Sequence, residues 1–316
     1  MIFVENKPLI FTPSFPDNWE VRRLPGAAPQ YWSGREGQVL LQQLRTPRYL
    51  IEYYVYRFVS EVTVFCKRQA GLQSILSLEG AVEHRVGKLE PMQLAQSQFI
   101  LVNGAGGPAS TIVPPGQECH VLNTYYSQDL YRDFEEVFPN LDKGRQRPRR
   151  YFFLSPQPQL LRTRVLDAVR AQFHEQFRPD LQRAFFELKV KETLFSLLAQ
   201  NDEPPSCQLD PRQKDIVEAA RAWIMKDLSR HYSNGDIARA VGMNEADLKR
   251  LFRQAYGVGM FHFLQRLRFE KAHEFLLYET RSIKQVAAAV GYHHTTTFIT
   301  EFRKFFGYTP SRVRGK

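Results

Sequence analysis

Residues 235–257, GDIARAVGMNEADLKRLFRQAYG, and residues 283–307, IKQVAAAVGYHHTTTFITEFRKFFG, are two copies of one pattern. Each copy contains, in the same order, a small residue, a glycine, two apolar residues four positions apart and a closing glycine. The second copy has one additional residue between its first glycine and its apolar pair, where a turn tolerates an insertion at little cost. This internal repeat decides the fold of the last third of the chain.

Each position of the pattern has a physical role in a helix-turn-helix unit. The small residue lets the first helix cross close to the second, and the first glycine permits the positive φ of a tight turn. The apolar pair holds the second helix against the core, and the closing glycine ends that helix. These positions are Ala238, Gly242, Leu248 with Phe252, and Gly257 in the first copy, and Ala287, Gly291, Phe298 with Phe302, and Gly307 in the second.

Residues 260–277 separate the copies, and we expect them to form one helix about 27 Å long. Such a helix could hold two recognition helices about one turn of duplex DNA apart, in successive major grooves. Its predicted apolar face is Phe263, Leu264, Leu267, Ala272, Phe275 and Leu276, and its predicted solvated face is Arg266, Arg268, Glu270 and Lys271.

A further helix is predicted before the repeat, over residues 211–230. Pro211 is a favourable first helical residue, and Asp210 can cap the helix. We expect its inward face to consist of Ile216, Ala219, Ala220, Trp223, Ile224 and Leu228.

The positive charge of the chain is concentrated in the same region. The net charge is +10, and residues 211–316 hold 19 Lys and Arg against 10 Asp and Glu, whereas the first 210 residues hold 24 against 23. A polyanion-binding surface needs such a local excess, because phosphate contacts supply most of the non-specific affinity for DNA. Charge alone would fit a basic solvated face equally well, and the repeat favours DNA binding.

The stretch from Asn234 to Pro310 resembles the DNA-binding domain of the AraC/XylS family of bacterial transcription regulators. The matching segments are IARAVGM, LKRLF, GVGMFHFLQRLRFEKAHEFL and IKQVAAAVGYHHTTTFITEFRKFFGYTP. The resemblance implies two helix-turn-helix units and a function as a sequence-specific transcription regulator. Many family members carry Ser-His or Ser-Gln before the Phe298 position, where this chain has Thr295, Thr296 and Thr297. The resemblance therefore leaves the base preference of the second unit undefined.

In the first unit, the resemblance places Ala246, Lys249 and Arg250 at base-reading positions, and we expect Arg253 to contact phosphate. Lysine and arginine can donate to guanine O6 and N7, and alanine can contact a thymine methyl group. The alternative for each cation is a solvated surface residue.

In the second unit, Thr295, Thr296 and Thr300 match base-reading positions. Short threonine side chains reach bases only at close approach or through water, so we expect weaker sequence discrimination than in the first unit. The expected phosphate contacts, which position the protein without specifying sequence, are Thr297, Arg303 and Lys304. His293 and His294 are expected to be exposed turn residues.

The first 140 residues contain short apolar runs separated by glycine and proline. The runs cover residues 38–44, 49–67, 72–86, 98–102 and 118–126. Many short strands without intervening helices predict a closed or sandwiched antiparallel sheet such as a jelly roll. Family members often carry a cupin-like barrel here. We therefore expect an α+β chain, with a cupin-like β-barrel and a helical hairpin followed by an all-α double helix-turn-helix domain.

Helical patterns follow the strands. We expect a helix over residues 128–138, and then a hairpin of helices over 157–177 and 180–199 that could pack on the barrel, on a second copy of the chain, or on both. Residues 201–210, NDEPPSCQLD, form a polar linker. The expected organisation is an effector-binding β domain (1–140), a helical hairpin for dimerisation (141–200), a linker (201–210) and a DNA-binding domain (211–316).

The β domain offers aromatic residues without a recognisable catalytic or metal-binding motif. His84 and His120 lack the spacing of a metal-binding cupin, so we expect no metal, no cofactor and no enzymatic activity. The aromatic residues, which could line an apolar ligand pocket or form the core, are Tyr53, Tyr54, Tyr56, Phe58, Phe65, Phe99, Tyr125 and Tyr126.

The cellular location is predicted from cysteine usage and hydropathy. Cys66, Cys119 and Cys207 are far apart and form no disulfide framework, which favours a reducing cytoplasm. No signal peptide is recognisable at the start, and no run approaches the ~20 apolar residues of a membrane helix.

The sequence thus predicts a homodimeric regulator, an activator controlled by a small-molecule effector in the β domain, that binds promoter DNA and could contact RNA polymerase. The stretch from Leu76 to Pro139, including the segment ending EEVFPNL, resembles the siderophore-responsive branch of the family. Two alternatives stay open: a DNA-binding regulator controlled by a protein partner, and a cupin enzyme with a DNA-binding appendage.

Overall fold

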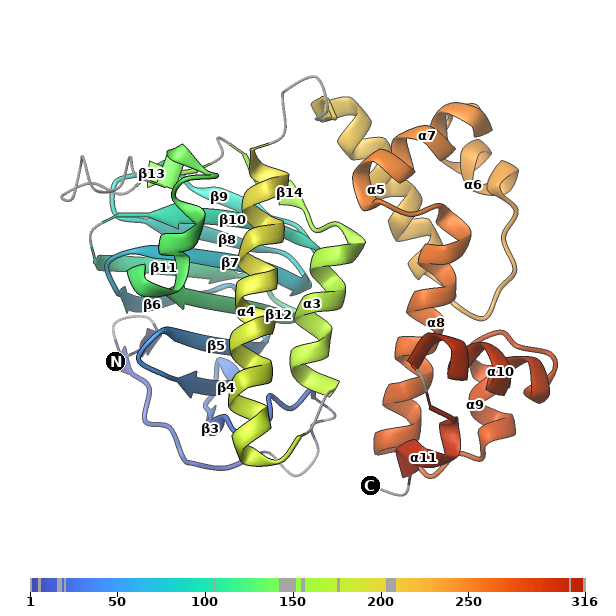
Figure 1. Cartoon of the computed structure of the whole chain (residues 1–316), viewed down its shortest axis with the longest axis horizontal. Helices are drawn as coiled ribbons and strands as arrows, with labels where there is room; N and C mark the ends of the chain where they lie inside the picture. Colours follow the sequence, from blue (N-terminus) through green and yellow to red (C-terminus); the bar gives the residue numbers. More distant parts are fainter. Residues whose placement is uncertain are drawn as a thin grey trace. The chain divides into compact units, whose positions relative to one another are not determined.

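The computed structural model describes residues 2–4, 7–15, 19, 21–104, 106–141, 152–154, 157–174, 177–202, 209–306 and 308–314. The chain divides into two compact units, Met1–Glu203 and Pro204–Lys316. Figure 1 shows strands and two long helices in the first unit and helices in the second. The predicted α+β fold class is confirmed. The predicted closing glycine Gly307 and Cys207 lie outside the described residues, and Cys66 and Cys119 are free thiols.

The first unit is built around two antiparallel sheets. Among the described strands, the smaller sheet has the order β2-β1-β6-β11-β8-β9 and the larger β13-β10-β7-β12-β5-β4-β3, with β14 also pairing with β10. The strands are β1 Ile2–Val4, β2 Lys7–Pro8, β3 Ala28–Ser33, β4 Gly37–Arg45, β5 Tyr49–Phe58, β6 Val62–Arg68, β7 Leu72–Glu79, β8 Val82–Val86, β9 Met92–Leu94, β10 Gln98–Asn103, β11 Gly107–Val113, β12 Glu118–Tyr126, β13 Phe152–Phe153 and β14 Gln159–Leu160.

The long apolar runs predicted over 49–67 and 72–86 are each two strands in different sheets. β5 and β7 belong to the larger sheet, whereas β6 and β8 belong to the smaller one. Gly80, with φ of 71°, turns the chain from β7 to β8. A Cβ at Gly80 would lie 2.7 Å from Cys119 Sγ, so this crossing leaves no room for a side chain. The chain therefore changes layer where the sequence reads as one continuous run.

The larger sheet faces a different core on each side. Tyr54 and Tyr56 lie between the two sheets, where their rings stack with centroids 5.5 Å apart. Tyr53 and Leu76 point the other way, into the core under the helices. The aromatic residues of the β domain are thus mainly core, although Phe65 is 39% exposed.

Two helices, α3 (Thr163–His174) and α4 (Pro179–Asn201), lie side by side over the larger sheet (Figure 1). The predicted helix over 157–177 begins only at Thr163, because Gln159 and Leu160 pair with β10 as β14. The predicted helix over 128–138 is also shorter. It consists of α1 (Gln128–Tyr131) and a 3₁₀ turn, η1 (Arg132–Phe134), and a second 3₁₀ turn, η2 (Pro139–Leu141), follows it.

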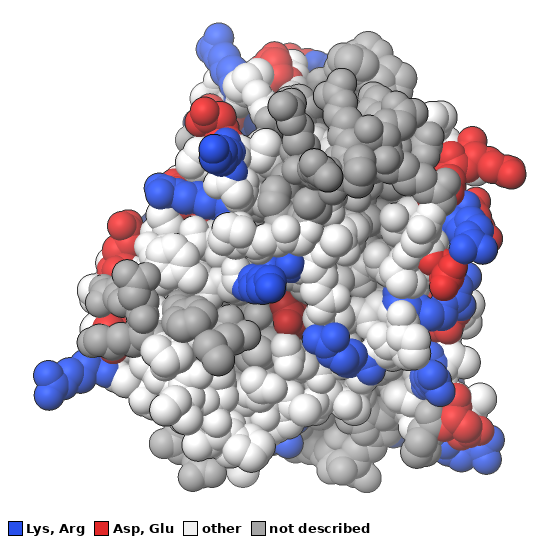
Figure 2. Space-filling view, turned by 90° about the vertical axis from the view of Figure 1, so that its left-hand side faces the viewer, with Lys and Arg blue, Asp and Glu red and all other residues white. Residues whose placement is uncertain are grey.

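Charged side chains are interspersed on the face of the molecule shown in Figure 2. Lysine and arginine lie beside aspartate and glutamate there, along both edges of the view and near its centre, with uncharged areas between them. Of the helices described, none is both long enough and apolar enough to cross a membrane.

The second unit contains α5 (Pro211–Met225), α6 (Asn234–Ala240), α7 (Glu245–Tyr256), α8 (Met260–Tyr278), α9 (Ile283–Ala289), α10 (Thr295–Phe306) and α11 (Pro310–Arg314). Asp210 caps α5 as predicted, and its carboxylate accepts from Gln213 N at 2.8 Å. The helix ends at Met225 and not near Arg230. Asp227 accepts from the backbone N–H of Ser229 at 2.9 Å, and such local bonds compete with helix continuation.

The inward face of α5 is rotated from the prediction. Val217 and Arg221 are buried, whereas Ile216 is half-buried and Ala219 is exposed. The reason is a polar contact that apolar periodicity cannot reveal. Glu218 Oε2 accepts from Arg221 NH1 at 3.1 Å and its Oε1 accepts from the hydroxyl of Tyr256 at 3.0 Å.

Candidate nucleic-acid interface

The first helix-turn-helix unit is α6 and α7 joined by a tight turn. The hydroxyl of Ser233 accepts from Asp236 N at 3.1 Å, and the Asp236 carboxylate accepts from Ser233 N at 3.2 Å, which completes a capping box. Gly242 has φ of 68°, and Met243 N donates to Ala238 O at 3.0 Å. Ala238 is buried, so the predicted close crossing and turn glycine are confirmed.

The second helix of this unit, α7, begins at the Asn244 cap and ends at Gly257, whose φ is 75°. Its buried side includes Leu248, Leu251 and Phe252. The predicted DNA-contact residues Ala246, Lys249, Arg250 and Arg253 are all exposed.

Two cations of α7 are paired with acids of the same helix. Lys249 forms an ion pair with Glu245, and Arg250 NH2 lies 3.4 Å from Asp247 Oδ1. The side chains of Lys249 and Arg250 are 51% and 63% exposed. Exposed pairs within one helix contribute only about 0.3–0.5 kcal/mol. Both cations can therefore exchange a carboxylate for a base edge or a phosphate at low cost.

The second unit, α9 and α10, repeats the same turn. Ser282 and Gln285 form the capping box, with Ser282 N donating to Gln285 Oε1 at 2.7 Å. Gly291 has φ of 81°, and Tyr292 N donates to Ala287 O at 2.9 Å. The predicted correspondence between the two units is confirmed at these positions.

The outward face of α10 carries the predicted threonines and cations. Phe298 and Phe302 are fully buried, and Thr295 is half-buried. The exposed residues are Thr296, Thr297, Thr300, Arg303 and Lys304. Lys304 Nζ lies 2.6 Å from Glu301 Oε1.

The hydroxyl of Thr300 is already used as a donor. Its Oγ1 donates to the backbone carbonyl of Thr296 at 3.0 Å. The oxygen keeps its capacity to accept, and the base groups that donate in the major groove are adenine N6 and cytosine N4. Thr300 thus presents an acceptor, whereas Lys249 and Arg250 present donors.

Two arginines of α8 that we predicted to be solvated are buried. Arg266 and Arg268 are 6% and 5% exposed. The prediction is wrong for these two residues because α8 packs against α5 and α7 as well as against α9 and α11, so only part of its surface, including Lys271, stays exposed. Arg266 Nε pairs with Glu270 Oε1 at 3.1 Å.

Arg268 connects the segment between α5 and α6 to the second helix-turn-helix unit. Its Nε donates to Leu228 O at 2.7 Å and its NH2 to Arg230 O at 3.0 Å. Its guanidinium carbon lies 5.9 Å from the ring centroid of Tyr292. Burial lowers the pKa of the guanidinium, but arginine stays charged at physiological pH.

Gly291 belongs to the same contact. A Cβ at Gly291 would lie 2.4 Å from Ser229 O and 2.8 Å from Arg268 NH2, whereas a Cβ at Gly242 would meet nothing within 4 Å. The second turn is therefore docked against the α5–α6 connection, and the first turn is open. We call Leu228, Arg230, Arg268 and Gly291 the Arg268 clamp.

The predicted DNA-contact residues all lie on α7 and α10, and the structure does not test their roles. Sequence reasoning missed the clamp. The available signal was the position of Arg268 between Leu267 and Phe269, within an apolar stretch where a solvated residue is unexpected.

The histidines of the β domain have separate partners. His84 Nδ1 lies 3.0 Å from Thr111 Oγ1, and burial lowers the pKa of His84 to about 3. His120 Nδ1 lies 2.5 Å from the hydroxyl of Tyr53, and its Nε2 lies 2.5 Å from Glu118 Oε1. In the described part of the chain, no three His, Cys, Asp or Glu side chains are grouped so as to hold a metal ion.

Comparison with known proteins defines the second unit. Residues 237–316 match the family model of a helix-turn-helix domain. This is an AraC-type helix-turn-helix domain. Over 131 residues the chain is 31% identical to the HTH-type transcriptional regulator ExsA of Pseudomonas aeruginosa, a match that covers 40% of this chain and 46% of ExsA.

A second relative is the HTH-type transcriptional activator RhaS of Pectobacterium carotovorum, 30% identical over 102 residues, which are 32% of this chain and 37% of RhaS. A similar solved structure is the C-terminal domain of AraT, a response regulator from Geobacillus stearothermophilus. It has 32% identity and a TM-score of 0.31 and covers 34% of this chain and 86% of that one. The matches thus span less than half of either curated relative. Within the AraC-type domain, α7 and α10 are the second helices of the two units.

Proposed function

We propose that the protein is a transcription activator that binds promoter DNA through α7 and α10 and responds to a small-molecule effector. The double helix-turn-helix domain with an exposed cationic face on α7 is the observation that carries this proposal. Lys249 and Arg250 would donate to base edges, with Ala246 in apolar contact, and Arg253 would contact phosphate. Activation would also require a contact with RNA polymerase.

On α10 the proposed base contacts are Thr295, Thr296 and Thr300, and the proposed phosphate contacts are Thr297, Arg303 and Lys304. The exposure of these side chains, apart from half-buried Thr295, supports the assignment. The acceptor presented by Thr300 would favour adenine or cytosine at its position.

Genome-wide binding of the tagged full-length protein tests this function. Wild type should occupy a limited set of promoters that share a sequence motif. The double variant Lys249→Ala, Arg250→Ala should lose the motif, whereas Lys271→Ala, which removes an exposed cation from α8, should keep it. Binding without any motif, or an unchanged motif in the double variant, would contradict base reading by α7.

We further propose that α4 forms the homodimer contact with a second copy of itself. Leu181, Leu188 and Phe195 are 48%, 67% and 38% exposed, and their spacing places them on one stripe of the helix. An antiparallel pairing about Leu188 would bring Glu187 of each copy opposite Lys189 of the other. Such a self-complementary arrangement is what a two-fold interface requires.

Sedimentation of wild type and Leu188→Asp tests the dimer. Wild type should sediment as a dimer at micromolar concentration and the variant as a monomer with an unchanged circular dichroism spectrum. Leu277→Asp on α8, which also replaces an exposed leucine, is the matched control and should stay dimeric. A monomeric wild type would overturn the proposal.

Control by an effector is tested by the melting temperature of the purified protein. A compound that binds only the native state raises it. The resemblance to the siderophore-responsive branch makes ferric siderophores one class to include. If none of the tested compounds changes melting or DNA binding while a purified protein partner does, control by a partner replaces this proposal.

A further inference from the structure

A cleft of about 650 Å³ lies in the first unit, between the first turns of α4 and the β4–β5 turn. Its volume falls within the range of small-molecule sites, about 300–1,000 Å³. Pro25 and Leu44 line it from the sheet side, and Gln182, Arg183 and Phe186 line it from α4.

The walls of the cleft are mainly apolar, and one hydroxyl that faces it has no hydrogen-bond partner among the described residues. Tyr49 is 4% exposed, yet its hydroxyl makes no hydrogen bond to any residue within the described ranges. Other polar groups of the cleft are engaged: Thr46 Oγ1 accepts from Tyr49 N at 3.0 Å, and Gln182 Oε1 accepts from Phe177 N at 2.7 Å. The Tyr49 hydroxyl is therefore free to donate a hydrogen bond to an oxygen of a ligand in the cleft.

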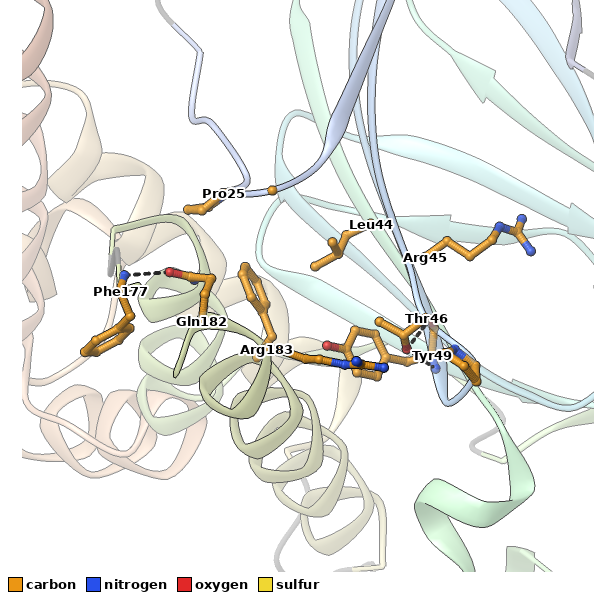
Figure 3. A pocket seen from close by; sticks show the side chains of 11 residues that line it. Pro25, Leu44, Arg45, Thr46, Tyr49, Phe177, Gln182 and Arg183 are labelled. Carbon is orange, nitrogen blue, oxygen red and sulfur yellow. Dashed lines mark hydrogen bonds between the residues drawn. The ribbon is translucent and has the colours of Figure 1, made fainter. Parts of the chain in front are cut away.

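Arg183 supplies a positive charge beside this hydroxyl, and the carboxylate of Glu187 is also close enough to act on it. Figure 3 shows its side chain reaching from α4 toward Tyr49, whereas the side chain of Arg45, which also lines the cleft, extends away from Tyr49. Arg183 forms no ion pair in the part of the chain that is described, because the neighbouring Glu187 is paired with Arg48. The site therefore combines a guanidinium with a hydroxyl, and both are donors.

The hydroxyl stays protonated at neutral pH. Burial and the charge of Glu187 raise the pKa of Tyr49 to about 12, against the opposing influence of Arg183. A neutral phenol can donate a hydrogen bond to an anion, and charge-assisted bonds of this kind are about twice as strong as neutral ones.

We propose that this cleft is the effector site and that it binds a small organic anion with an apolar body. Arg183 and the Tyr49 hydroxyl receive the carboxylate, and Leu44 and Phe186 contact the apolar part. The proposal that the cleft binds an anion is argued from the cleft residues alone. Only its role as the effector site rests on the proposed function. The geometry favours a monoanion, because one guanidinium and one hydroxyl provide for one carboxylate.

Calorimetric titration of the full-length protein tests the site. The probes are octanoate and 3-phenylpropionate, each paired with its neutral amide. Both carboxylates should bind saturably with Kd below about 1 mM, and the amides should bind at least tenfold more weakly. Arg183→Gln and Tyr49→Phe should each weaken carboxylate binding at least tenfold without lowering the melting temperature of the free protein. Arg132→Gln, an exposed arginine outside the cleft, should bind as wild type does.

Equal binding of acid and amide would overturn the anion assignment. Absence of saturable binding by all probes, or unchanged binding in both cleft variants, would overturn the site. If Arg183→Gln lowered the melting temperature, its weaker binding could reflect lost stability. Tyr49→Phe, which removes one oxygen and keeps the ring, then tests the binding role by itself.

DNA binding measured on the same proteins separates this inference from the proposed function. If the protein binds promoter DNA but no carboxylate, the function stands and the site is overturned. If it binds carboxylates at the cleft but shows no specific DNA binding, the site stands and the regulator proposal fails.

Discussion

The two helix-turn-helix units share a backbone and differ in what surrounds it. Their turns have nearly the same φ at Gly242 and Gly291, and each has a capping box at its first helix. The turn of the first unit is open, but that of the second is docked against Ser229. The outward face of α7 carries a lysine and arginines, whereas that of α10 carries threonines together with Arg303 and Lys304.

The internal repeat thus preserves the backbone geometry, whereas the exposed side chains of its two copies differ. We expect the first unit to specify the DNA sequence, because long cationic side chains can reach guanine. We expect the second unit mainly to anchor the protein on the duplex.

We expect the largest difference between the two units when their turn glycines are replaced. Gly291→Ala should lower the free energy of unfolding by more than about 3 kcal/mol, because a left-handed alanine costs about 1–2 kcal/mol and the clash with Ser229 adds to it. Gly242→Ala should cost about 1 kcal/mol, since it has only the conformational cost. Urea denaturation followed by far-ultraviolet circular dichroism measures both. Equal losses would show that docking does not constrain the second turn.

The next effect should come from the Arg268 clamp. Arg268→Met removes the donors to Leu228 O and Arg230 O and should lower the free energy of unfolding by about 2–3 kcal/mol. It should also allow the distance between the two helix-turn-helix units to vary more. Inserting one base pair between the half-sites should weaken DNA binding by wild type more than binding by the variant, as measured by gel shift. Lys271→Met, on the exposed side of α8, is the control, and identical spacing dependence in all three proteins would contradict a positioning role.

Removing a base-reading side chain of the first unit should cost less free energy than Gly291→Ala or Arg268→Met, but the loss should be confined to the preferred DNA site. Arg250→Ala should cost about 2 kcal/mol at the preferred site and little on random DNA. Arg303→Ala on α10 should weaken both by similar amounts and reduce the slope of log affinity against log salt by about 1. Titrations on both DNAs at several salt concentrations make the comparison. If the two variants behaved alike, the division between specifying and anchoring units would be lost.

The smallest effect should be that of Thr300. Its proton is held by Thr296 O, so Thr300→Ala removes only an acceptor and should cost about 0.5 kcal/mol at the preferred site. Gel shift on operators with each base at the facing position measures it. A loss of binding free energy as large as that of Arg250→Ala would show that α10 contributes as much to sequence discrimination as α7.

The repeat was sufficient to predict both turns and the buried pairs of α7 and α10, because these depend on residues close in sequence. Gly242 must tolerate a positive φ and Leu248 must face the core whatever surrounds the unit. The apolar runs of the β domain also predicted a closed or sandwiched antiparallel sheet, although not that a single run crosses from one sheet to the other.

Features set by distant contacts could not be predicted. Arg268 is buried because backbone carbonyls some 40 residues away accept its protons, and no local pattern contains that information. The strand at Gln159 and Leu160 exists because β10 offers it an edge. In the same way, Tyr49 and Arg183 meet only when α4 packs beside β5.

The Arg268 clamp has a mechanical consequence for DNA. With the second turn docked against Ser229, we expect rotation of the units about α8 to be restricted, so a mismatch between their separation and the helical repeat of DNA would have to be taken up by the nucleic acid. Bending a site of this length costs about 1–6 kcal/mol, depending on how easily its central steps deform. The base pairs between the half-sites, which neither α7 nor α10 would contact, should therefore influence affinity, and flexible pyrimidine–purine steps there should be preferred.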